Sequence, residues 1–166
     1  MLPESLITIL RGEERPKDIS ALEKELSEAE LKGYKIPTMN FEKSIITQEQ
    51  AREALVKLNV DENSLFGQVM ITYRNFPLGQ GEELYPLREI FDIADNSNWE
   101  DEFPGFSNNF LQLSSIEGEG SYFYEKSSEA VYNCGWGEMK LLVEKRIKPS
   151  WKNYQNFLFW YYEINA

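Results

Sequence analysis

Four short runs predict a β-sheet of three or four strands: Phe110-Leu-Gln-Leu-Ser-Ser-Ile116, Ser121-Tyr-Phe-Tyr-Glu-Lys126, Glu129-Ala-Val-Tyr-Asn-Cys-Gly-Trp136 and Met139-Lys-Leu-Leu-Val-Glu-Lys-Arg-Ile147. β-Branched and aromatic residues fill these runs, and glycine or polar pairs separate them, which is typical of an antiparallel meander. Side chains alternate along a strand, so Tyr122 and Tyr124 should share one face while Phe123 takes the other. A small sheet with an apolar face must be covered by other elements of the chain.

Helical patterns precede the sheet. The segment from Leu2 to Leu10 predicts a short helix, and Ser20-Ala-Leu-Glu23 and Thr47-Gln-Glu-Gln50 both have the spacing of a capping box. Asp61 is placed to begin a further helix, whose apolar side is broad enough to be buried. The segment Asn96–Asn109 is expected to be a polar, acidic loop.

The last element is expected from Ser150 to about Ile164 as a strongly aromatic helix. Such a helix either wedges between the sheet and another element or displays a ring to a partner, and wedging is favoured because aromatic residues usually serve the core. The fold class predicted is α+β: an antiparallel meander covered by N-terminal helices and an aromatic C-terminal helix. At 166 residues the chain is expected to be one domain.

Composition excludes several classes of site. The chain has no histidine, so imidazole bases and the usual zinc sites cannot form, and we expect neither a metal nor another cofactor. Cys134 is the only cysteine, and we expect a buried structural thiol in a reducing cytoplasm. No apolar run reaches the roughly 18 residues of a membrane span, and the start lacks the features of a signal peptide.

The net charge of −11 disfavours nucleic acid and anionic membranes and favours a basic partner. The charge is uneven, because residues 92–138 hold ten acids against Lys126 alone, whereas residues 139–166 carry an excess of bases. Such carboxylates either lie on turns and faces exposed to solvent, or together produce a negative electrostatic field that steers a cationic partner. The candidate partner-binding residues are Trp99, Glu100, Asp101, Glu102, Glu117 and Glu119. We expect Glu100, Asp101 and Glu102 to be replaceable by lysine with little loss of stability.

The stretch Glu117-Gly-Glu-Gly120 comes nearest to a catalytic or phosphate-binding motif. They make a poor phosphate cradle, because two carboxylates face the phosphate and no Lys-Ser/Thr follows, and a tight turn between strands explains them better. A glycosidase pair of Glu117 and Glu119 lacks an enclosing pocket. We expect no enzymatic activity.

Six segments carry a resemblance to a known family: Tyr73-Arg-Asn-Phe76, Glu83-Leu-Tyr-Pro-Leu-Arg-Glu-Ile90, Phe110-Leu-Gln-Leu113, Glu119-Gly-Ser-Tyr-Phe-Tyr124, Glu129-Ala-Val-Tyr132 and Trp151-Lys-Asn-Tyr-Gln-Asn-Phe-Leu158. Together they resemble the SUKH superfamily over roughly residues 60–162. On this reading residues 1–59 form an N-terminal helical region and residues 60–166 the family-like core, within one domain spanning 1–166.

The resemblance implies a non-catalytic α+β domain. Most bacterial members are immunity proteins that bind and neutralise a toxin, often a nuclease, and others are regulatory or scaffold modules. We therefore expect a cytoplasmic immunity protein that occludes a basic toxin with its acidic surface. The alternative is a regulatory or scaffold module that binds an endogenous partner.

Overall fold

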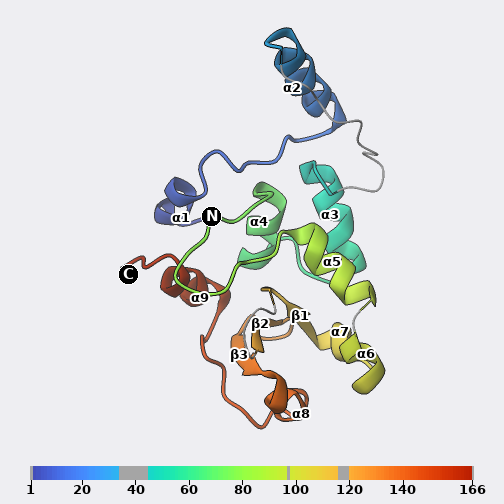
Figure 1. The fold of residues 1–166 in the computed structure, drawn as a ribbon, viewed down its shortest axis with the longest axis vertical. Helices are drawn as coiled ribbons and strands as arrows, with labels where there is room; N and C mark the ends of the chain where they lie inside the picture. Colours follow the sequence, from blue (N-terminus) through green and yellow to red (C-terminus); the bar gives the residue numbers. More distant parts are fainter. Residues whose placement is uncertain (1, 34–44, 97, 116–119, 166) are drawn as a thin grey trace.

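The computed structural model describes residues 2–33, 45–96, 98–115 and 120–165, and these form an α+β fold (Figure 1). The helices before the sheet are α1 (Glu4–Ile9), α2 (Ile19–Leu31), α3 (Gln48–Lys57), α4 (Leu65–Thr72), α5 (Leu87–Asn96), α6 (Asn98–Glu102) and α7 (Phe106–Asn109). The strands are β1 (Phe110–Gln112), β2 (Gly120–Glu125) and β3 (Val131–Gly135). They are followed by the 3₁₀ helix η1 (Trp136–Glu138), α8 (Met139–Val143) and α9 (Tyr154–Tyr161).

The predicted meander is confirmed for its first three runs. The strands pair antiparallel in the order β1-β2-β3, and Phe123 lies opposite Gln112 on one side and Tyr132 on the other. The fourth run is wrong as a strand, because its first residues form α8. Met139 and Leu142 are buried three residues apart, which is the spacing of one face of a helix.

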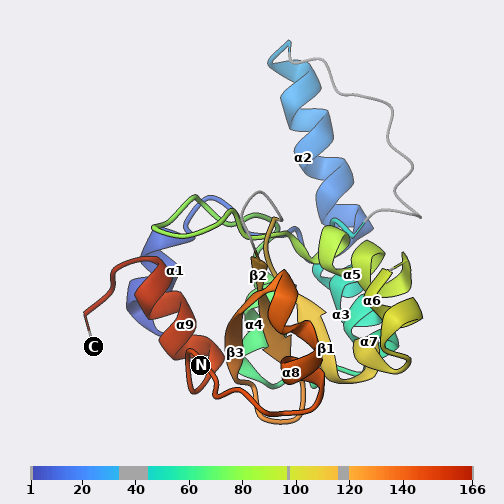
Figure 2. The same cartoon turned by 60° about the horizontal axis from the view of Figure 1, so that its bottom comes forward.

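The two faces of the sheet are buried in two separate cores, as the alternation along β2 predicts. Tyr122 and Tyr124 belong to the larger core, which includes residues of α1, α3, α4, α5 and α9. Phe123 belongs to the smaller core, together with Phe106 of α7 and Met139 of α8. Figure 2 shows α4 on one side of the sheet and α8 on the other. The sheet is therefore covered on both faces.

The aromatic helix α9 is wedged in the larger core, as predicted, although it begins later than expected. Its cap is Asn153, whose side chain accepts a hydrogen bond from the N–H of Asn156, and not Ser150. The Ser150 hydroxyl instead accepts from the N–H of Asn133, and Trp151 pairs with Val131 of β3 as an isolated bridge. The segment before α9 thus extends the sheet edge, which prevents an earlier helix start.

Other helix starts test the capping predictions. The Thr47 capping box is confirmed, with both reciprocal hydrogen bonds formed. However, α2 is capped by Asp18 instead of Ser20, and α4 is capped by Ser64 instead of Asp61. In both cases the cap is another short polar residue within three positions of the predicted one: Asp18 accepts from the N–H of Ala21, and Ser64 accepts from the N–H of Gly67. Residue type alone cannot decide between such neighbouring candidates.

Helix α2 projects away from the rest of the protein (Figures 1 and 2). Leu22 near its start is buried, whereas Leu31 at its end is 88% exposed. Across the described ranges, every helix is too short or too polar to cross a membrane.

Candidate functional site

Four of the six candidate partner-binding residues lie on one short helix. Trp99, Glu100, Asp101 and Glu102 belong to α6, in the segment where a loop was predicted and where the structure has α6 and α7. The loop prediction is therefore wrong: hydrogen bonds from Gly105 and Ser107 to the Glu100 carboxylate order this segment. Glu117 and Glu119, the other two candidates, lie outside the described residues.

Trp99 attaches α6 to the smaller core and remains partly exposed. Its ring stacks on that of Trp136 in η1, with the ring centroids 5.5 Å apart and the planes inclined by 25°. It also lies 6.4 Å from the ring of Phe103, one helical turn later. An aromatic pair that is half in the core and half in solvent is a rigid apolar contact surface, of the kind found at binding hot spots.

Glu100 has a structural role. Its carboxylate accepts hydrogen bonds from the backbone N–H of Gly105, at 2.7 Å, and of Ser107, at 3.0 Å. These backbone donors, first Ser107 and then Gly105, lower the pKa of Glu100 below its ordinary value. The contacts hold the turn at Gly105, whose φ of 88° is left-handed, and set the start of α7. These hydrogen bonds argue against the expectation that Glu100 can be reversed with little loss of stability, and we expect Glu100→Lys to destabilise this turn.

Asp101 and Glu102 are exposed, and neither makes an ion pair with any described residue. The sequence has no lysine or arginine between Arg88 and Lys126, so no base follows them nearby in the chain. Helix α5, which precedes α6 directly, adds the exposed acids Asp92 and Asp95. We call these four residues the acidic edge. Four carboxylates on adjacent helices produce a negative local potential.

Trp136 and Glu138 were missed as site residues. Trp136 was assigned to the end of a strand, but η1 carries it to the surface beside Trp99, and the exposed Glu138 follows two residues later. No local pattern identifies this neighbour, because residues 99 and 136 meet only through the tertiary packing of the smaller core.

The described residues give little support for covalent chemistry. Cys134 is fully buried, as predicted, and burial, followed by the charge of Glu138, raises the pKa of its thiol to about 11. A thiol with so high a pKa is a weak nucleophile at neutral pH. Within the described ranges, no three Cys, Asp or Glu side chains come together in a group that could hold a metal ion.

Comparisons with known proteins give no match: no family model matches the sequence, and no curated protein or solved structure is significantly similar to the chain.

Proposed function

We propose that this protein is a SUKH-type immunity protein that binds a basic toxin domain, of the nuclease kind, and neutralises it without catalysis. One observation carries the proposal: Trp99, which stacks on Trp136 of η1 and is partly exposed, lies on the same short helix as the exposed acids Asp101 and Glu102. An aromatic anchor next to unpaired carboxylates is suited to a cationic protein surface.

The physical logic is one of substrate mimicry. A nuclease needs a basic groove to hold its polyanionic substrate, and that groove attracts a protein with negative potential. The carboxylates then set the association rate. The Trp99–Trp136 pair, once buried against the toxin, sets how slowly the complex dissociates. We also propose a cytoplasmic location, because a single buried thiol, Cys134, suits a reducing compartment.

The test is co-expression in bacteria with the C-terminal domain encoded by the neighbouring open reading frame, scored by growth. The wild-type protein should restore growth, and the double variant Asp101→Lys/Glu102→Lys should protect poorly. Glu100 stays unchanged in this design, because its carboxylate holds the turn after α6.

The matched control is Glu28→Lys/Glu30→Lys on α2, which makes the same change in net charge at two exposed positions. It should protect as well as the wild type. No rescue by the wild-type protein, together with recovery of a housekeeping partner from unchallenged cells, would favour a regulatory module and contradict the immunity proposal.

A further inference from the structure

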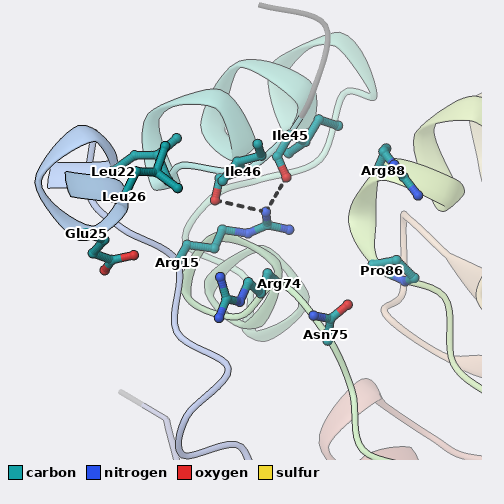
Figure 3. A pocket seen from close by; sticks show the side chains of 10 residues that line it. All are labelled: Arg15, Leu22, Glu25, Leu26, Ile45, Ile46, Arg74, Asn75, Pro86 and Arg88. Carbon is teal, nitrogen blue, oxygen red and sulfur yellow. Dashed lines mark hydrogen bonds between the residues drawn. The ribbon is translucent and has the colours of Figure 1, made fainter. Parts of the chain in front are cut away.

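A pocket of about 370 Å³ lies between α2, the segment before α3, the end of α4 and the start of α5. Three arginines line it: Arg15, Arg74 and Arg88. Figure 3 shows Arg15 and Arg74 between Leu22 and Leu26 on one side and Arg88 and Pro86 on the other. This volume is in the range of sites for small molecules.

Arg15 is the buried cation of this pocket, with 4% of its surface exposed. Its Nε donates to the carbonyl of Met70 at 2.9 Å, and one terminal nitrogen, Nη1, donates to the carbonyls of Ile45 and Ile46 at 2.5 Å and 3.4 Å. These carbonyls orient the guanidinium without cancelling its charge. Among the described residues, no carboxylate pairs with Arg15, and no acceptor is bonded to its other terminal nitrogen, Nη2.

The other two arginines add to this uncompensated charge. Burial lowers the pKa of Arg15 to about 10, and repulsion from the nearby Arg74 is the second cause of this shift. Neither Arg74 nor Arg88 forms an ion pair with a described residue, and Glu25 is the one carboxylate among the described residues that line the pocket. Three cations against one acid are unexpected in a protein with a net charge of −11.

We propose that this pocket binds a small organic anion, with a phosphate or carboxylate head held by Arg74, Arg88 and the free terminal nitrogen of Arg15. The guanidinium fork matches both oxyanions with paired hydrogen bonds, and an anion in this place relieves the repulsion between Arg15 and Arg74. Leu22, Leu26 and Pro86 offer an apolar wall to the body of the ligand. The inference does not depend on the proposed immunity function.

The test uses phenyl phosphate, benzoate and inorganic phosphate as probes, titrated into the full chain and followed by isothermal calorimetry and amide NMR shifts. Phenyl phosphate should bind saturably and more tightly than inorganic phosphate, and saturable binding of benzoate would show that the site also holds a carboxylate head. Arg74→Ala and Arg88→Ala should each weaken binding by about tenfold or more, because each removes a charge-assisted hydrogen bond.

The matched control is Arg11→Ala, which removes an exposed arginine outside the pocket and should leave the affinity unchanged. Equal weakening by Arg11→Ala and Arg74→Ala would overturn the site, since it would reduce binding to net charge. The proposal also fails if neither phenyl phosphate nor benzoate saturates at millimolar concentration, or if phenyl phosphate binds no better than inorganic phosphate.

Discussion

Phe66 joins α4, the sheet and α9, so its removal should destabilise the larger core more than other single changes on α4. Its side chain is fully buried. The ring stacks on Tyr124 of β2 with centroids 4.2 Å apart, and it meets Tyr154 of α9 edge-on at 5.1 Å. One side chain therefore carries contacts between three elements that are distant in sequence.

We expect Phe66→Ala to lower the free energy of unfolding by about 3–5 kcal/mol, the usual cost of emptying a buried aromatic site. That is a large share of the roughly 5–15 kcal/mol by which domains are stable. Urea unfolding followed by circular dichroism measures it: with a slope of about 2 kcal/mol per molar, the midpoint should fall by about 2 M. Val56→Ala, at a position that is 71% exposed, is the control.

A double-mutant cycle isolates the ring contact from the cavity. Phe66→Leu and Tyr154→Leu, alone and together, should show a coupling free energy of about 0.5–1.5 kcal/mol. A midpoint for Phe66→Ala that shifts no further than that of Val56→Ala would refute the reasoning, because Phe66 would then not be a central core residue. If the changes in unfolding free energy of the two single variants simply add, only the contact between Phe66 and Tyr154 is refuted, and the role of Phe66 in the core stands.

Three further predictions follow from local contacts. Because the pKa of Glu100 is lowered in the folded protein, its carboxylate contributes its full stabilisation above the ordinary glutamate pKa of about 4.3. This stabilisation is lost as the pH falls through the lower folded-state pKa. The unfolding midpoints of Glu100→Gln and the wild type should therefore differ at neutral pH and converge in acid. The Cys134 thiol should react with Ellman's reagent very slowly in the native protein and fully in urea; fast native reaction would contradict its burial. Gly120→Ala should destabilise by about 1–3 kcal/mol in urea unfolding, because its Cβ would lie 2.1 Å from the Cys134 carbonyl oxygen; a neutral change would mean that β2 and β3 can separate freely there.

The sheet could be predicted because alternation is a local property. The order Tyr122, Phe123, Tyr124 already assigns each ring to a face, and the register bears this out. The helix starts were less predictable, since several polar residues near α4 could each have served as the cap and only the packed chain selects Ser64. The run after Met139 fits both a strand and a helix over its few residues, and burial of Met139 and Leu142 decides for the helix.

The acidic site could be predicted only in part. Charge counting finds Asp101 and Glu102, but it cannot separate them from Glu100, whose neighbours in space are the N–H groups beyond a left-handed glycine. The arginine pocket left no local signal either. Arg15, Arg74 and Arg88 lie in three separate stretches of the sequence and converge through tertiary folding.

The central claim is that the acidic edge and the Trp99–Trp136 pair bind a basic partner. The most direct measurement is the association rate constant, by stopped flow at several ionic strengths, between this protein and the C-terminal domain encoded by the neighbouring open reading frame. We predict a rate that falls steeply with salt and drops about tenfold or more in Asp101→Lys/Glu102→Lys, with a much smaller change in Glu28→Lys/Glu30→Lys. A rate that is indifferent to salt and to the Asp101 and Glu102 reversal would contradict the claim.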